Sequence, residues 1–307
     1  MEDAEKSRGG REAGRRWSLD SKLETPDSKQ TSEVCEAVQY PNIDPVIIKI
    51  GPLSLRWYGL MYVFGFLSSY LLAVYQLKRK APKIGKSQLD DLYFYLILGL
   101  IIGARLGYVV FYNAGFYLKN PLDVFAVWHG GMSFHGGLIG AFLAGYLIIR
   151  KNHLRFFEVV DLIIPTCPPG LMFGRIGNFI NGELFGKPSG VPWAMVFPQG
   201  GNLPRHPSQL YEALLEGLLL FLILWVYKDR KKREGDVFAL FLILYGAFRV
   251  VCEFFREPDV QIGYIFGFLS MGQILSLAMI ALGMFLKLLY LPSHTGKQVP
   301  RAQKDHR

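Results

Sequence analysis

Long apolar segments alternate with short polar segments along most of the chain. Each apolar segment is close to the ~20 residues that an α-helix needs to cross a bilayer. Seven of them are predicted to be transmembrane helices, and they lie near residues 57–77, 91–112, 132–150, 158–178, 209–227, 236–255 and 267–290. The pattern therefore predicts an all-α polytopic membrane protein with seven transmembrane helices.

The fourth apolar segment differs from the others because proline interrupts it at Pro165, Pro168 and Pro169, with Gly170 following. Proline removes helical hydrogen bonds and bends the helix axis. Inside a membrane, irregular backbone is tolerated where protein covers it or where it lines a wet cavity. We therefore expect a broken helix beside a cavity.

Small residues recur at a spacing of four in the second and third segments. They are Gly99, Gly103 and Gly107 in the second segment and Gly136, Gly140 and Ala144 in the third. This spacing lets two helix backbones approach closely within a membrane. The pattern indicates helix packing rather than chemistry.

The two ends of the chain differ in composition from the apolar region between them. Residues 1–39 are polar and carry charges of both signs, so we expect a disordered extension. Residues 40–291 are expected to form the membrane domain, followed by a basic cytoplasmic tail at 292–307. Residues 182–208, which are rich in glycine and proline, are expected to form a small extracytoplasmic cap.

Lysine and arginine cluster after every second apolar segment. The clusters are Lys78, Arg79, Lys80, Lys83 and Lys86; Arg150, Lys151 and Arg155; Lys228, Arg230, Lys231, Lys232 and Arg233; and Lys297, Arg301, Lys304 and Arg307. Positively charged loops remain on the cytoplasmic side, which predicts an N-terminus outside and a C-terminus in the cytoplasm.

Composition supports a membrane protein and argues against several other classes. Of the 307 residues, 51% are hydrophobic, and the mean hydropathy is +0.23. The net charge of +9 comes from the short loops, so we expect membrane lipids and no nucleic acid as partners. Cys35, Cys167 and Cys252 show no paired spacing, and we expect no disulfide framework, no metal site and no cofactor.

One stretch at the end of the fourth segment combines glycines with polar side chains at membrane depth. It reads Gly174-Arg-Ile-Gly-Asn-Phe-Ile-Asn-Gly-Glu-Leu-Phe-Gly186. An arginine at the bilayer centre costs ~2.5–3.5 kcal/mol on the insertion scale, which favours a functional role over a random one. Glycine allows close approach to a ligand, and amides with a guanidinium suit an anionic partner. Arg175 is therefore the leading candidate for anion binding.

A second charged element lies near the outer end of the sixth segment. Arg249, Glu253 and Arg256 have the spacing i, i+4 and i+7, so they share one helical face. An ion pair within lipid is one interpretation. Two arginines against one carboxylate also leave a positive excess that suits a phosphate. Arg105 could add to this excess or could pair with a carboxylate, and the sequence leaves both open.

The remaining candidates lie toward the same outer side. His135 opens the third segment at a depth similar to that of Arg175, and histidine can move a proton near neutral pH. Tyr58 could hydrogen-bond a lipid headgroup or anchor the first segment at the interface. His206 precedes the fifth segment, where Glu212 could be a supporting partner.

Four motifs resemble those of bacterial prolipoprotein diacylglyceryl transferases. They are His135-Gly-Gly-Leu138, the thirteen-residue stretch Gly174 to Gly186, Arg205-His-Pro-Ser-Gln-Leu-Tyr-Glu212, and Arg249 with Glu253-Phe-Phe-Arg256-Glu-Pro-Asp259. The glycine-rich stretch looks like the signature of that family. The resemblance extends from about residue 40 to about residue 291.

The resemblance implies transfer of the diacylglyceryl group of phosphatidylglycerol to the lipobox cysteine thiol of a preprolipoprotein, with glycerol phosphate released. It implies a bacterial plasma (inner) membrane location with the active site on the extracytoplasmic side. By similarity, Arg175 binds the lipid phosphate. The other residues that the resemblance brings to the lipid site are Asn178, Glu183, Gly186 and Tyr58. His135, Arg249 and Glu253 are the implied catalytic residues, and Arg256, His206 and Arg105 are supporting candidates. The sequence leaves open whether His135 or an arginine network activates the thiol.

Two other functions are compatible with parts of the sequence. An anion or lipid transporter would explain the broken fourth segment and the buried arginines, but transporters often contain two related halves and no internal repeat is visible here. A membrane scaffold would leave the clustered charges unexplained. Transfer of a labelled diacylglyceryl group to a lipobox peptide separates the transferase from both.

Overall fold

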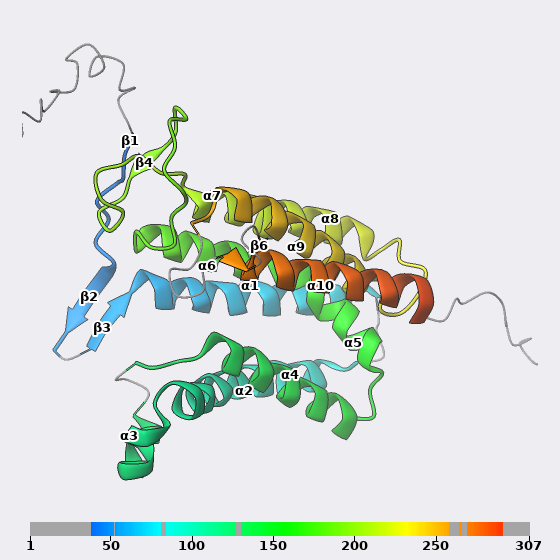
Figure 1. Ribbon diagram of the computed structural model, residues 1–307. Coiled ribbons are helices and arrows are strands. Elements are labelled where there is room, and N and C mark those ends of the chain that lie inside the picture. The colour runs from blue at the N-terminus through cyan, green and yellow to red at the C-terminus, as the bar shows by residue number, and fades with distance from the viewer. Residues whose placement is uncertain are drawn as a thin grey trace, which may run out of the picture. The chain divides into compact units, whose positions relative to one another are not determined.

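The computed structural model describes residues 38–51, 53–80, 84–126, 130–257, 264–265 and 269–290. Most of the polar extension and the whole of the basic tail predicted from the sequence lie outside these ranges. Within them the chain is mostly helical (Figure 1).

The helices coincide with the predicted apolar segments. The first three segments correspond to α1 (Trp57–Lys80), α2 (Lys86–Tyr112) and α4 (Phe134–Lys151), and the short helices α3 (Ala114–Lys119) and η1 (Pro121–Phe125) lie between α2 and α4. The fourth comprises α5 (Phe156–Ile163), η3 (Ile164–Thr166) and α6 (Pro168–Ile180). The fifth comprises α7 (Ser208–Glu212), the π-helical segment η4 (Ala213–Leu219) and α8 (Leu220–Tyr227). The last two are α9 (Asp236–Phe255) and α10 (Met271–Phe285), which continues as η5 (Leu286–Tyr290).

Within the described residues, five helices are long and apolar enough to cross a membrane, and a sixth candidate is the bent pair formed by Phe156–Thr166 and Pro168–Ile180. The two halves of that pair meet at 41°. The break falls where the prolines predicted it, so the predicted interruption of the helix is confirmed. Helix α4 is not among the six, since His135, four glycines and the terminal Arg150 and Lys151 reduce its hydropathy.

The strands are short and form two-stranded pairs. Strand β1 (Val38–Gln39) pairs in parallel with β4 (Met195–Val196), whereas β2 (Val46–Ile50) with β3 (Leu53–Arg56) and β5 (Tyr264–Ile265) with β6 (Leu269–Ser270) are antiparallel. Strand β4 belongs to residues 182–208, which are otherwise irregular (Figure 1). A backbone bridge between Gly186 and Arg256 attaches this segment to the end of α9.

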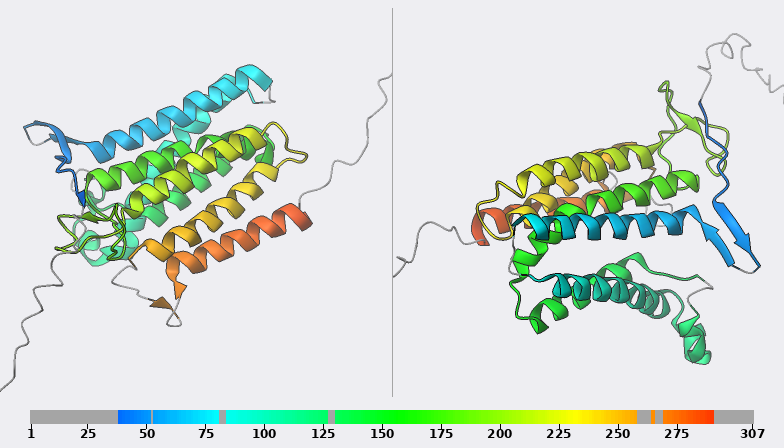
Figure 2. Two further views of the ribbon diagram at one scale, coloured as in Figure 1. Left: turned by 90° about the horizontal axis from the view of Figure 1, so that it is seen from above. Right: turned by 180° about the vertical axis from the view of Figure 1, so that it is seen from behind.

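Helix packing divides the helices into neighbouring pairs (Figure 2). Helix α2 packs against α4, α9 against α10, and α1 against α6. Buried apolar residues of α1, α2, α4 and α5 join the α2–α4 pair to the others, among them Ala73, Leu92, Ile149 and Val159. Beside them, the Ser69 hydroxyl lies 2.8 Å from the Tyr93 hydroxyl and 2.7 Å from the Thr166 hydroxyl, which connects α1 and α2 to the break before α6.

A buried carboxylate, that of Asp161, joins α5 to the connection between α8 and α9 and to the start of α9. Asp161 of α5 accepts hydrogen bonds from Lys231 Nζ at 2.8 Å and from the backbone N–H groups of Gly235 and Phe238 at 2.8 and 3.0 Å. Gly235 precedes α9 and has no side chain to cap the helix. Asp161 therefore satisfies N-terminal donors of α9 that would otherwise be unpaired.

The small residues predicted to bring two helices together lie at the α2–α4 contact. A Cβ added at Gly103 would lie 2.7 Å from the Cα of Gly140, and one added at Gly107 would lie 2.7 Å from the Cα of Gly136. Real Cβ atoms do not approach backbone this closely, so glycine is required at these positions. The sequence interpretation of a packing stripe is confirmed.

We predict that Gly103→Ala destabilises the protein by about 1–3 kcal/mol, because the added methyl group forces α2 and α4 apart. Thermal unfolding of the purified chain in detergent measures the change. Gly115→Ala is the matched control, since a Cβ at Gly115 meets nothing within 4 Å. Equal melting temperatures for the two variants would contradict the close packing of α2 and α4.

Candidate functional site

A connected group of three arginines and three glutamates lies where α6, α7, η4 and α9 meet, and we call it the charged cluster. Its members are Arg175, Glu212, Glu216, Arg249, Glu253 and Arg256. Helix α6 and the end of α9 supply the arginines, and three different elements supply the carboxylates. The two charged motifs that the sequence shows are thus brought together.

Glu212 connects the two motifs directly. Its Oε2 lies 2.6 Å from Arg175 Nε and 3.0 Å from Arg249 Nη1. The Glu212 side chain is 2% exposed, whereas that of Arg175 is 22% exposed. A bridging carboxylate between two arginines fixes their separation and partly offsets the cost of burying them.

Arg249 is surrounded by carboxylates. Besides Glu212, its Nη1 lies 3.5 Å from Glu216 Oε1, and its Nη2 donates to Glu253 Oε1 at 2.6 Å. Glu253 in turn accepts from the Ser270 hydroxyl at 2.7 Å and lies 3.6 Å from Arg256 Nη1. The positive excess expected from Arg249 and Arg256 against Glu253 alone is therefore offset by Glu212 and Glu216.

Arg175 is the arginine of the cluster with the most accessible side chain. Its Nε is paired with Glu212, and its Nη2 lies 3.7 Å from Glu216 Oε2. Among the ion pairs of the described residues, none uses Arg175 Nη1. One edge of this guanidinium therefore remains able to donate to an anion, in the planar geometry that suits two phosphate oxygens.

The polar residues that follow Arg175 converge on Glu183. Its Oε1 accepts from Asn178 Nδ2 at 2.8 Å and from Asn181 Nδ2 at 3.2 Å, and its backbone carbonyl accepts from Gln209 Nε2 at 2.6 Å. Gly182 has φ +65°, in the left-handed region that favours glycine. These contacts fix the turn after α6 and hold it against the start of α7.

Gly186 closes the glycine-rich stretch against its neighbours. Its N–H donates to the His206 carbonyl at 2.8 Å, and a Cβ at this position would lie 2.8 Å from the Cβ of His206. Any larger residue would push this segment away from His206 and from the end of α9. Gly186 thus has a packing role beside the cluster.

Tyr58 and His206 both lie near the glycine-rich stretch. The Tyr58 hydroxyl lies 3.1 Å from that of Tyr62, and a Cβ at Gly177 would lie 3.0 Å from the Tyr58 ring. His206 Nδ1 lies 3.0 Å from the Tyr211 hydroxyl, which also accepts from Trp193 Nε1 at 2.6 Å. Burial lowers the pKa of His206 from its ordinary value, which favours the neutral ring.

His135 is exposed in the first turn of α4, with its ring edge-on to that of Phe134 at 5.7 Å between centroids. Within the part of the chain that the structure describes, no hydrogen bond or ion pair joins His135 to the charged cluster. Both lie toward the same ends of the helices, since α4 begins where α6 and α9 finish (Figure 1).

Arg105 has backbone partners rather than the carboxylate or anion considered from the sequence. It donates to five carbonyls, those of Asp123, Val124, Ala126, Gly130 and Gly131. Its side chain also lies over the Tyr117 ring at 5.2 Å. This arrangement orders the connection between α2 and α4.

Glu216 is the member of the cluster that the sequence reasoning missed, and Glu212 was weighed only as a supporting partner. The signal was present, because Glu216 is one of two carboxylates within the fifth apolar segment, the other being Glu212. Ionisable residues inside membrane helices are rare and usually paired. The partner of Glu216 could not be chosen from the sequence, since it depends on how α6 and α9 pack against η4.

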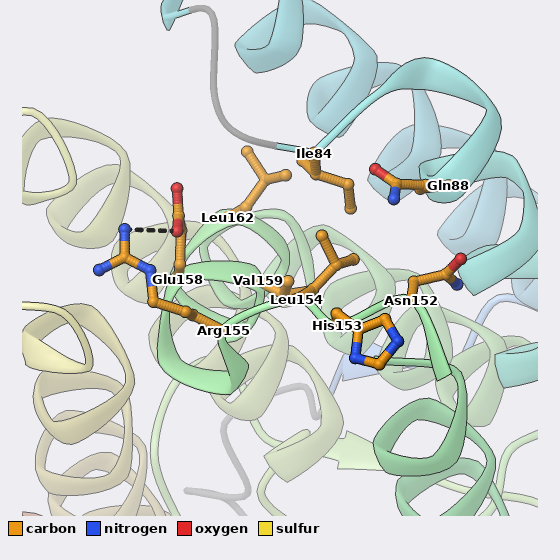
Figure 3. A pocket seen from close by; sticks show the side chains of 9 residues that line it. All are labelled: Ile84, Gln88, Asn152, His153, Leu154, Arg155, Glu158, Val159 and Leu162. Atoms are coloured by element: carbon orange, nitrogen blue, oxygen red, sulfur yellow. Dashed lines mark ion pairs between the residues drawn. The ribbon is translucent and has the colours of Figure 1, made fainter. Parts of the chain in front are cut away.

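A cavity of 320 Å³ lies elsewhere, where the start of α2 meets the connection between α4 and α5 (Figure 3). It is lined by Ile84, Gln88, Asn152, His153, Leu154, Arg155, Glu158, Val159 and Leu162. Arg155 is already paired with Glu158 at 3.0 Å and with Glu234. None of the candidate site residues lines this cavity.

Comparison with known proteins finds close relatives over most of the chain. A family model described as "Prolipoprotein diacylglyceryl transferase" matches residues 45–289. A protein of Nitratidesulfovibrio vulgaris (strain DP4) named "Phosphatidylglycerol--prolipoprotein diacylglyceryl transferase" is 55% identical over 252 residues, which cover 80% of this chain and 94% of the relative. Proteins of the same name from Bordetella avium and Coxiella burnetii are 53% and 52% identical, over 81% and 80% of this chain and 95% of each relative.

We predict that Glu212→Gln lowers the free energy of unfolding by about 3–5 kcal/mol, because it removes the shared partner of two buried arginines. Chemical unfolding in detergent micelles measures this loss. Glu257→Gln, which removes the 43% exposed partner of Arg205, is the matched control and should cost about 1 kcal/mol or less. Similar losses for both variants would show that the Glu212 bridge is unimportant for stability.

Proposed function

The chain belongs to the prolipoprotein diacylglyceryl transferase family, and we propose that it transfers the diacylglyceryl group of phosphatidylglycerol to the thiol of a preprolipoprotein's lipobox cysteine. The thiol sulfur forms a bond to the glycerol carbon of the diacylglyceryl group, and the bond from that carbon to the phosphate oxygen breaks. The products are a thioether and glycerol phosphate. This is the first step of bacterial lipoprotein maturation.

The observation that carries the proposal is the bridged pair of arginines. Arg175 and Arg249 come from two motifs far apart in the sequence, and Glu212 holds both within 3.0 Å of one carboxylate oxygen. Negative charge grows on the phosphate oxygens as the carbon–oxygen bond breaks. A positioned guanidinium stabilises that charge without having to reorganise during the reaction.

In this proposal Arg175 binds the lipid phosphate through its exposed edge. Asn178, Glu183 and Gly186 shape the same site, since the contacts of Glu183 and Gly186 fix the turn after α6. The Tyr58 ring lies against Gly177, which belongs to the part of the glycine-rich stretch on α6. Tyr58 is proposed to contact the headgroup. These roles make the glycine-rich stretch the phosphatidylglycerol side of the site.

Attack by the cysteine thiol needs a protein group that promotes its deprotonation to the thiolate. Ionising a free cysteine thiol, with a pKa of ~8.5, at neutral pH costs ~2 kcal/mol. We propose His135 as the base, with Arg249 and Glu253 as the second charged element. Arg256 and His206 are proposed to support the cluster, and Arg105 to support His135 by ordering the connection that precedes α4.

The site is proposed to open on the extracytoplasmic side of the bacterial plasma membrane. The proposed domain of residues 40–291 crosses that membrane seven times, with α4 as the third crossing. The N-terminus is then outside and the C-terminus cytoplasmic. The support is the location of the basic residues, since Lys228, Lys231 and Arg233 lie between α8 and α9, at the opposite ends of the helices from Arg175.

The direct test of the function uses purified chain, phosphatidylglycerol with a labelled acyl chain and a peptide that contains a lipobox cysteine. A thioether-linked, labelled peptide and free glycerol phosphate are the expected products. A peptide with serine in place of the cysteine should remain unlabelled. Lipid movement without labelled peptide would favour a transporter and contradict the proposal.

We predict that Arg175→Lys and Arg175→Ala both lower transfer at least 100-fold, because a lysine ammonium cannot reproduce a planar pair of N–H donors. The rate of labelled transfer at saturating peptide is the measurement. Membrane levels and melting temperatures of both variants must match those of the unmodified chain. A well-folded Arg175→Ala variant with near-normal transfer would refute phosphate binding by Arg175.

His135→Gln should reduce transfer about 100-fold or more near neutral pH, since glutamine keeps a hydrogen-bonding side chain but cannot accept the thiol proton. The rate should recover partly as the pH rises toward the thiol pKa of ~8.5. A pH–rate profile of both proteins measures this. Unchanged rates at all pH values would remove His135 from the proton transfer.

Reporter fusions test the proposed orientation. A reporter inserted between α8 and α9, within residues 228–235, should give a cytoplasmic signal, and one within residues 190–203 an extracytoplasmic signal. The charged loops predict this arrangement because they resist translocation. Reversed signals at both positions would place the charged cluster on the wrong side for the proposed reaction.

A further inference from the structure

Every arginine of the charged cluster already has a carboxylate partner within the described residues. The cations are Arg175, Arg249 and Arg256, and the carboxylates are those of Glu212, Glu216 and Glu253. A phosphate diester bound at Arg175 adds one negative charge to these existing pairs. An uncompensated charge in such a buried site is costly. Binding should therefore be accompanied by the loss of one negative charge elsewhere in the cluster.

The contacts of the three carboxylates show which one has the least stabilisation of its negatively charged form. Glu212 makes two short contacts, at 2.6 and 3.0 Å, with the two arginines it bridges. Glu253 accepts at 2.6 Å from an arginine and at 2.7 Å from the Ser270 hydroxyl. Glu216 has only longer contacts, at 3.5 and 3.7 Å, although its side chain is 1% exposed. Hydrogen bonds to a carboxylate stabilise its charged form, so Glu216 is stabilised least.

Few cations near Glu216 could compensate its charge once Arg175 also contacts a phosphate. Segment η4 packs against α6, α7, α8 and α9. The charged and titratable groups on these elements that interact with Glu216 are Arg175, Glu212, Tyr245, Arg249 and Cys252, and α8 has no ionisable side chain before Tyr227. Once a phosphate pairs with the free edge of Arg175, Glu216 shares that arginine with Glu212 and the phosphate. The other cation near Glu216 is Arg249, which Glu212 and Glu253 already share.

We propose that Glu216 takes up a proton from solvent when phosphatidylglycerol binds. This inference rests on the proposed function, because it takes the lipid phosphate as the ligand of Arg175. One proton enters with each lipid, so the proton offsets the negative charge that the phosphate brings. By linkage, a ligand that binds together with a proton binds more weakly as the pH rises. Glu216 is thus a positioning residue that couples lipid affinity to pH, not a group that reacts with the substrate.

The test is isothermal titration calorimetry on the full chain in phosphatidylcholine nanodiscs, with short-chain phosphatidylglycerol as the titrant. Titrations in buffers of different ionisation enthalpy give the number of protons taken up per lipid. For the unmodified chain we expect the uptake to pass through a maximum that approaches one proton, at a pH between the pKa of Glu216 in the free chain and its pKa in the lipid-bound chain. The dissociation constant should rise with pH by up to about tenfold per pH unit where the uptake is at its maximum, and it should level off where the uptake falls to zero.

Variants identify the group that takes up the proton. Glu216→Gln should bind the lipid with uptake near zero at every pH, whereas Glu216→Asp should retain uptake because it keeps a titratable carboxylate. Glu158→Gln is the matched control, since Glu158 pairs with Arg155 outside the cluster, and it should behave as the unmodified chain does.

Three results would overturn the inference. They are an unmodified chain that binds lipid without proton uptake at any pH, uptake that persists in Glu216→Gln, and uptake that is lost in Glu253→Gln but not in Glu216→Gln. If Glu216→Gln does not fold, the unmodified chain and Glu216→Asp still decide the question. Failure of the unmodified chain to bind phosphatidylglycerol at all would contradict the proposed function, whereas binding without uptake contradicts only this inference.

Discussion

The bridge that Glu212 makes between Arg175 and Arg249 is the interaction on which the rest of the site depends. Two guanidinium groups inside an apolar helical domain repel each other and are costly to desolvate. A single buried carboxylate oxygen lies within 3.0 Å of both guanidinium groups, so it offsets their repulsion and fixes their separation. The other contacts follow from it, because Glu216 and Glu253 complete the surroundings of Arg249 and leave an edge of Arg175 accessible.

Irregular helix geometry makes that bridge possible. The break before α6 redirects the chain by 41°, and the π-helical segment η4 follows Glu212 directly. Single π turns inside helices occur often at functional sites, because they change the direction of side chains. Gly217 lets η4 approach α6 closely, since a Cβ there would lie 2.9 Å from the Cα of Met172. Two departures from regular helix geometry therefore lie in the segments that carry Arg175, Glu212 and Glu216.

Much of the helical layout could be predicted from the sequence because it depends on local pattern. Apolar length gave the helix ranges, the prolines gave the break before α6, and the glycine spacing gave the α2–α4 contact. The glycine-rich stretch and the Arg249 motif were each recognisable, since charged residues at membrane depth are costly. Each of these signals lies within one segment.

What could not be predicted depends on partners from other segments. Glu216 lies near Arg175 and Arg249 only because α6 and α9 both pack against η4. Arg105 resembled a candidate anion ligand, but the fold surrounds it with backbone carbonyls. For the same reason, the excess of positive charge inferred from Arg249 and Arg256 is absent once Glu212 and Glu216 are counted. The sequence identifies charged residues that are costly to bury, and only the packing of the helices shows which partners offset that cost.

The proposed chemistry depends above all on direct contact between the exposed edge of Arg175 and the lipid phosphate. Solid-state NMR can measure this contact as a dipolar coupling between ¹⁵N-labelled arginine guanidinium groups and the ³¹P nucleus of bound phosphatidylglycerol. We expect a coupling that corresponds to a separation of about 4 Å, as a direct guanidinium–phosphate hydrogen bond requires, and that disappears in Arg175→Lys. A coupling of the same strength in Arg175→Lys, or none in the unmodified chain with lipid bound, would contradict it.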